Sequence, residues 1–227
     1  MTQTSGLTRV LDYRLADYPF PGVVQELFGC ASLDRLHEHY PRPVHANGDQ
    51  DTPAHALFYR EYARISGLYE QFVREVVAPA YGGEELCVQT VPTFRIHYPG
   101  ALAVREFHRD SDYNHQVGIT NYWLPLTPAF ATNSIWLETE PYSEQFRPVD
   151  LLPGQVLRFD AVQLKHGNHR NDTEATRVSF DFRVLPMSDY RETGLTSVNR
   201  GVRLGLESYY MLLTRDGEFR HATRGRP

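Results

Sequence analysis

Six short segments rich in β-branched and aromatic residues follow one another between residues 86 and 185, and they constrain the fold more than any other feature. The segments are LCVQTVPTFRIHY, ALAVREFH, QVGITNYWLPL, NSIWLETE, QVLRFD and RVSFDFRVL. This composition, with turns at fairly regular spacing, is typical of β-strands. No amphipathic segment of helical length lies between them, which disfavours βαβ units. An antiparallel sandwich or barrel of roughly eight strands is therefore predicted.

The residues before this run are expected to be mostly helical. From about Leu57 to Val77, apolar side chains recur every three or four residues, and Pro79 then stops the pattern. A weaker helical pattern follows Pro21-Gly22, and the polar stretch PVHANGDQDTPAHA between the two patterns indicates a loop. Near the C-terminus, LESYYMLL is interpreted as the apolar part of a further helix.

These patterns predict one domain of mainly β structure, a double-stranded β-helix (jelly roll) buttressed by N-terminal helices. The chain of 227 residues is long enough for one sizeable core. We expect a helical buttress over residues 1–85, the jelly-roll core over 86–186 and a C-terminal extension over 187–227.

The charge and cysteine content limit the kinds of partner and the cellular compartment that we expect. The net charge of −5 and the pI near 6.0, without a dense basic run, argue against a nucleic-acid partner or an anionic membrane surface. No apolar stretch resembles a signal peptide or a membrane span. Cys30 and Cys87 are expected to be reduced thiols of a cytoplasmic protein, with a disulfide as the less favoured alternative.

His108, Asp110 and His166 are the candidate metal ligands. Two residues apart on an extended segment, His108 and Asp110 project to the same side. The pair alone says little, because the composition predicts roughly 0.6 chance occurrences of His-x-Asp. A jelly roll can return the strand of His166 beside them, and two imidazoles with one carboxylate leave three positions open on an octahedral ion. His169 is the rival third ligand, which we disfavour.

The segment Arg177–Val184 alternates between an apolar and a polar face. Its polar face carries Arg177, Ser179, Asp181 and Arg183, and an ordinary solvent-facing strand would show the same pattern. However, a guanidinium with a hydroxyl two residues later is well suited to grip a carboxylate.

His-x-Asp, a distal His and then Arg-x-Ser resemble the signature of the iron(II)/2-oxoglutarate-dependent dioxygenase superfamily. Tyr98-Pro99-Gly100 is similar to a segment of prolyl-hydroxylase-like members. HYPG, NYWLPL, TNSIWLE, HGNHRN and RVSFDFRV look like small bacterial members related to a streptomycin-biosynthesis protein. The resemblance covers about residues 87–186.

The resemblance implies that His108, Asp110 and His166 bind iron(II). It also implies that Arg177 and Ser179 hold 2-oxoglutarate, and Tyr98 and Asn121 are expected to assist them. Candidates for contact with substrate are Arg95, Gln89, Trp123, His115 and Arg183. Because Asp110 is present where related halogenases carry a small residue, hydroxylation, desaturation or cyclisation is favoured over halogenation.

The expected function is oxidation of a polar small molecule of specialised metabolism by dioxygen, with release of succinate and CO₂; hydroxylation is the favoured outcome. Two alternatives stay open: a cupin-type isomerase or lyase that does not use 2-oxoglutarate, and a non-catalytic binding protein. The sequence identifies no substrate, and it allows a homodimer.

Overall fold

Two antiparallel sheets form the body of the protein. The computed structural model describes residues 6–43, 50, 52–103, 106–197, 201–206 and 208–221. In these residues the larger sheet runs in the order β1-β7-β4-β9-β2-β10-β11, and β3 pairs with β9 beside β2. Its strands are β1 (Thr8–Asp12), β2 (Leu86–Gln89), β3 (Thr93–His97), β4 (Thr120–Pro125), β7 (Gln155–Phe159), β9 (Arg177–Pro186), β10 (Tyr210–Leu213) and β11 (Phe219–Arg220).

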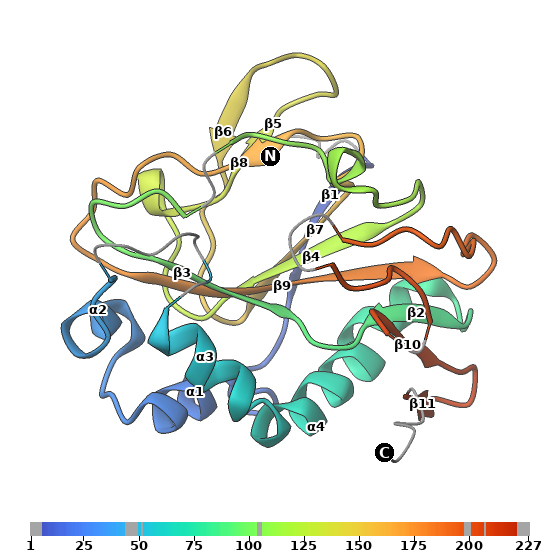
Figure 1. Cartoon of the computed structure of the whole chain (residues 1–227), viewed down its shortest axis with the longest axis horizontal. Coiled ribbons are helices and arrows are strands. Elements are labelled where there is room, and N and C mark those ends of the chain that lie inside the picture. The colour runs from blue at the N-terminus through green and yellow to red at the C-terminus, as the bar shows by residue number, and fades with distance from the viewer. Residues whose placement is uncertain are drawn as a thin grey trace.

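The smaller sheet has the order β6-β5-β8 and lies across the larger one from the helices (Figure 1). Its strands are β5 (Trp136–Glu138), β6 (Phe146–Pro148) and β8 (His166–Gly167). The antiparallel jelly-roll architecture predicted from the strand pattern is confirmed.

In the described part of the chain, four α-helices cover the outer face of the larger sheet (Figure 1). They are α1 (Phe20–Phe28), α2 (Leu36–His39), α3 (Pro53–Arg60) and α4 (Ala63–Phe72). A π-helical turn over Val73–Val77 and a 3₁₀ turn over Ala78–Tyr81 extend α4. Further 3₁₀ turns lie at Leu33–Arg35, Asp110–Tyr113 and Ala131–Asn133. The single helix expected from Leu57 to Val77 is thus broken into α3 and α4, since Glu61 leaves the helical conformation.

Strand β9 separates the core from the site. Its apolar side chains face the helices, where the ring of Phe180 lies 5.5 Å from that of Phe58. Phe94 of β3 stacks on the same Phe58 ring at 4.1 Å. The polar side chains of β9 point to the opposite face and are also buried, with Arg177 only 1% exposed. The alternative of a solvent-facing strand is therefore wrong.

Three segment predictions need correction. The last four residues of LESYYMLL form strand β10 instead of a helix, because Tyr210–Leu213 pairs with β2 and long-range pairing outweighs the local pattern. Strand β1 was not foreseen; it completes the sheet beside β7. In the expected strand 101–108, the described residues pair only at His108, and residues 104–105 lie outside the described part.

Both cysteines are buried free thiols, as expected. No helix in the described ranges is long and apolar enough to cross a membrane.

Candidate metal centre and adjoining pocket

Backbone pairing brings the three candidate ligands together. His108 and His166 form an antiparallel bridge in which each amide donates to the other's carbonyl at 2.9 Å. The amide of Asp110 donates to the carbonyl of Ala161 at 2.8 Å, just after β7. The segment of His166 does return beside His108, as the jelly-roll argument required.

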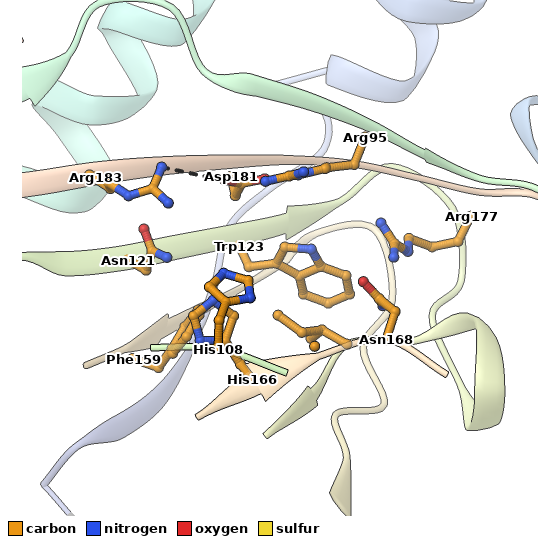
Figure 2. A pocket seen from close by; sticks show the side chains of 12 residues that line it. Arg95, His108, Asn121, Trp123, Phe159, His166, Asn168, Arg177, Asp181 and Arg183 are labelled. Carbon is orange, nitrogen blue, oxygen red and sulfur yellow. Dashed lines mark hydrogen bonds and ion pairs between the residues drawn. The ribbon is translucent and has the colours of Figure 1, made fainter. Parts of the chain in front are cut away.

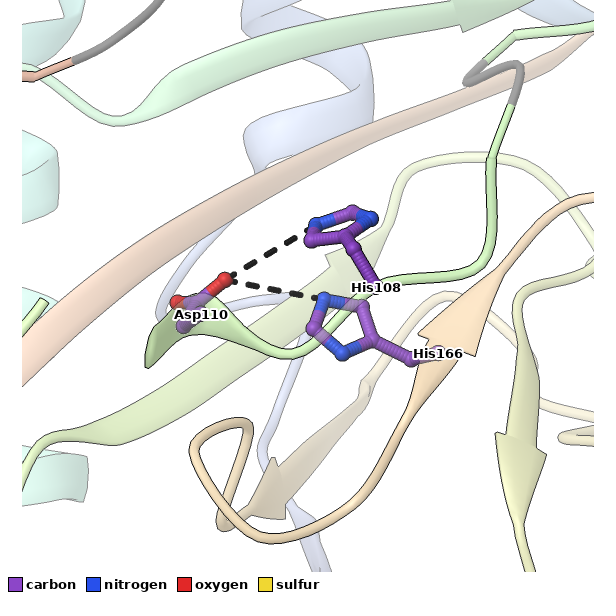
Figure 3. A group of neighbouring side chains, drawn as sticks. All are labelled: His108, Asp110 and His166. Atoms are coloured by element: carbon purple, nitrogen blue, oxygen red, sulfur yellow. Dashed lines mark ion pairs between the residues drawn. The ribbon is translucent and has the colours of Figure 1, made fainter. Parts of the chain in front are cut away.

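The ligand atoms of His108, Asp110 and His166 lie within 4.8 Å of one another (Figure 3). From Asp110 Oδ1, the distances are 3.9 Å to Nε2 of His108 and 3.8 Å to Nε2 of His166. The Nδ1 atoms lie 3.1 Å from the carbonyl of Glu106 and 3.2 Å from that of Leu164. These carbonyls favour a proton on Nδ1, which leaves each Nε2 lone pair directed toward the carboxylate.

Burial and neighbouring charges set the protonation states that a metal needs. Burial acts to raise the pKa of Asp110, but Arg183 and His166 outweigh it and lower that pKa below its usual range. Burial, followed by the charge of His108, lowers the pKa of His166 to about 4. At neutral pH the site therefore presents a carboxylate and a neutral imidazole, which are the forms that bind metal ions.

These residues fit a divalent first-row metal. Nitrogen and oxygen donors without thiolate suit iron(II), and the 2-His-1-carboxylate set leaves open positions. His169 does not take part: it is exposed, and its ring packs against Trp136 with centroids 4.5 Å apart.

A pocket opens beside the triad between the two sheets (Figure 2). Three of its basic side chains come from β3 and β9, and aromatic and amide groups line the remainder. The lining residues are Arg95, His108, Asn121, Trp123, Ile135, Phe159, His166, Gly167, Asn168, Arg177, Asp181 and Arg183.

Arg177 is held in a fixed orientation at the end of the pocket away from Arg183 (Figure 2). Its Nε donates to the carbonyl of Asn133 at 3.0 Å, and its NH1 donates to Oγ of Ser179 at 2.8 Å. NH2 lies 3.4 Å from Nδ1 of His97, and the guanidinium carbon is 5.5 Å from the ring centre of Trp123. Ser179 thus orients the guanidinium and is not itself among the lining residues.

Two other residues that were expected to contact ligands, Arg95 and Asn121, line the pocket. Arg95 lines the pocket and forms an ion pair with Asp181 at 2.7 Å. Asn121 also lines it and donates to Oδ2 of Asp110 at 3.3 Å. The buried Oδ1 of Asn121 has no hydrogen-bond partner among the described residues.

Four residues that were expected to contact ligands either lie outside the pocket lining or contact other protein side chains. Tyr98 and His115 are buried but are not among the lining residues. Gln89 bonds to Tyr209, whose hydroxyl donates to Oε1 at 2.8 Å. Arg183 lines the pocket, but its guanidinium contacts Asp110. No role beside Arg177 was predicted for His97. Tyr209 was missed because its segment was assigned to a helix.

Comparison with known proteins agrees with these findings. The streptomycin biosynthesis protein StrG of Streptomyces griseus is 34% identical over 200 residues, which cover 88% of this chain and 96% of the relative. A search of protein-family models gave no match. The sequence resemblance to a streptomycin-biosynthesis protein is confirmed.

Solved structures confirm the fold. CytC3 with Fe(II) and alpha-ketoglutarate has a TM-score of 0.52 at 16% identity, covering 97% of this chain and 86% of that chain. EctD from S. alaskensis with bound Fe has a TM-score of 0.50 at 14% identity, covering 82% and 74%. The chain therefore has the jelly-roll fold of the 2-oxoglutarate oxygenases.

Proposed function

Because the chain belongs to the family of the streptomycin biosynthesis protein StrG, we propose that it is a biosynthetic non-haem iron(II) oxygenase that uses 2-oxoglutarate. The observation that carries this proposal is the convergence of His108, Asp110 and His166 beside a pocket that ends at a buried arginine. An iron(II) ion and the oxo-acid would supply activation of dioxygen coupled to oxidative loss of CO₂, leaving succinate.

In this proposal His108 and His166 give one nitrogen each to iron(II), and Asp110 gives one oxygen. Asp110 and His166 are in the protonation states that bind a metal at neutral pH, because the pKa of each is lowered. The carbonyls bonded to Nδ1 hold both rings in place, so the site needs little rearrangement to accept an ion.

Arg177 binds the distal carboxylate of 2-oxoglutarate. The guanidinium is fixed by Asn133 and Ser179, so its orientation is set before the oxo-acid arrives. A planar guanidinium can hold both oxygens of a carboxylate at once. Trp123 lies between this arginine and the two imidazoles, and Asn121 lines the pocket at the end away from Arg177, where it would assist in holding the oxo-acid (Figure 2).

The substrate is a polar small molecule of specialised metabolism, and hydroxylation is the proposed outcome. Asp110 is present where the family resemblance would place a small residue in a halogenase, which argues against halogenation. Among the described residues the remaining pocket wall carries charge of both signs, in the ion pair between Arg95 and Asp181. Such a wall suits hydroxyl, amino or carboxyl groups better than a hydrocarbon.

The direct test measures binding of 2-oxoglutarate to anaerobic, Fe(II)-loaded protein by calorimetry, followed by succinate formation in air. We expect metal-dependent binding that Asp110→Ala abolishes and Arg177→Gln weakens by about 2 kcal/mol or more, the scale of a hydrogen bond to a charged group. The matched control His169→Ala removes an exposed imidazole nearby and should bind as the wild type does.

Three results would contradict the proposal or favour another function. Metal binding without any metal-dependent binding of the oxo-acid would contradict it, and turnover that needs metal but no 2-oxoglutarate would favour a cupin-type isomerase or lyase. A protein that binds neither would point to a non-catalytic role.

A further inference from the structure

The two oxygens of the Asp110 carboxylate have different surroundings. Oδ1 faces the imidazoles, with both Nε2 atoms within 3.9 Å. Oδ2 instead accepts hydrogen bonds from Nε of Arg183 at 2.7 Å and from Nδ2 of Asn121 at 3.3 Å. Oδ1 accepts one hydrogen bond, from NH2 of Arg183 at 3.2 Å, so the guanidinium contacts both oxygens and makes its shorter bond to Oδ2. Oδ1 is thus the oxygen directed at the metal position, and Oδ2 is committed to the protein.

Arg183 is itself anchored from its other side. Its NH1 lies 3.0 Å from the hydroxyl of Tyr209 and 3.4 Å from Oε1 of Gln89, and that hydroxyl donates to the same Oε1 at 2.8 Å. Gln89 ends β2, and Tyr209 immediately precedes β10, so two neighbouring strands fix the guanidinium. Arg183 is 8% exposed and lies on the inner face of β9, beside Asn121 (Figure 2).

We propose that Arg183, braced by Tyr209 and Gln89, restricts Asp110 to binding the metal through Oδ1 alone. The inference rests on the proposed function, because it concerns the same metal site. Arg183 is then a positioning residue: it touches neither the metal nor the oxo-acid and acts through the carboxylate.

The number of bound oxygens matters because an octahedral ion has six positions. Two imidazoles and one carboxylate oxygen leave three, which accommodate a chelating oxo-acid and dioxygen. A carboxylate that rotated and bound through both oxygens would leave two, enough for the oxo-acid but not for dioxygen as well. The hydrogen bonds from Arg183 and Asn121 hold Oδ2 away from the metal and oppose this rotation.

The test counts the water molecules bound to Mn(II) in the metal-loaded protein, from the broadening of its electron paramagnetic resonance in ¹⁷O-enriched water. The wild type should show three exchangeable waters. Arg183→Met removes every hydrogen bond to Oδ2 except that of Asn121, and two waters are expected. Arg183→Lys keeps a cationic donor within reach of Oδ2, so three waters should be restored.

A milder pair of variants covers the case in which Arg183→Met does not fold. Tyr209→Phe removes only the hydroxyl that braces the guanidinium and should weaken Mn(II) binding, by up to the roughly 10-fold typical of lost outer-shell partners. Tyr210→Phe, its neighbour on β10, removes the hydroxyl of a buried tyrosine that makes no hydrogen bond to Arg183 in the described part of the chain, and it should leave the affinity unchanged.

The outcomes separate the two proposals. Three waters in Arg183→Met, or equal Mn(II) affinities in Tyr209→Phe and Tyr210→Phe, would overturn the role of Arg183 while leaving the iron site intact. A wild-type protein that binds no Mn(II) would instead contradict the proposed function itself.

Discussion

Acid should destabilise the metal-free protein well above the range in which carboxylates titrate. Three buried histidines have lowered pKa values, in each case mainly through burial: about 4 for His97, about 3 for His115 and about 4 for His166. Positive neighbours add to the effect, namely Arg177 beside His97 and Arg183 beside His115. All three imidazoles are 8% exposed or less, so solvent screens these effects little.

The sign and size of this loss of stability follow from the linkage between protonation and folding. An unfolded imidazole titrates near 6.5, above the folded values, so the stabilisation is complete above that pH and is lost as the pH falls. At pH 5.5 each unfolded imidazole gains about 1.4 kcal/mol by protonation that the folded one cannot gain, and three give roughly 4 kcal/mol. That is a large part of the ~5–15 kcal/mol by which a domain is usually stable.

Urea unfolding followed by tryptophan fluorescence measures this effect. The samples should contain a chelator, because a bound metal competes with the proton at His166. The free energy of unfolding should fall by about 4 kcal/mol between pH 7.5 and 5.5, and His115→Gln should remove roughly a third of that change. A change below ~1 kcal/mol in the wild type, or a rise toward acid, would refute the reasoning.

Four further predictions concern the metal site, helix α4 and the core. His166→Ala should abolish Ni(II) binding in calorimetry, whereas His169→Ala should preserve it; loss in both would contradict the choice of ligand. In Gly167→Ala the added Cβ would lie 2.9 Å from a ring atom of Phe107 and 3.1 Å from its Cα. The free energy of unfolding should therefore drop by roughly 1–3 kcal/mol, and metal binding at the adjacent His166 should weaken. Gly67→Ala, where nothing lies within 4 Å on α4, should instead raise the melting temperature through a gain of about 0.5–1 kcal/mol. Phe94→Ala should cost about 3–5 kcal/mol in urea unfolding, and a loss below 1 kcal/mol would show that its ring stack does not matter.

The clustering of the candidate ligands His108, Asp110 and His166 was predictable because each has a chemically distinctive side chain and a local context. His108 and Asp110 share one side of an extended segment, and a jelly roll needs only to return one strand to place His166 beside them. The polar face of β9 was equally readable from its alternation, since a period of two fixes which side chains share a face.

The partners of those side chains were not predictable. Alternation placed Arg183 on the pocket face, but its contact with Asp110 depends on β9 and the 3₁₀ turn Asp110–Tyr113, which meet only in the folded protein. Tyr209 was not predicted as a partner because the local pattern of its segment resembles a helix. Strand β10 forms because β2 is available to pair with it. Local sequence carries no record of such long-range pairing.

Strand β1 has a consequence for the order of folding. Thr8 pairs with Phe159, and the amide of Asp160 donates to the carbonyl of Leu7 at 2.9 Å, next to the residue that holds Asp110. During synthesis β1 leaves the ribosome long before β7 exists, so it stays unpaired until most of the chain is made. Contacts so distant in sequence form slowly. We therefore expect the N-terminal helices to form early and the corner that supports Asp110 to close late, so that metal uptake follows completion of the sheet.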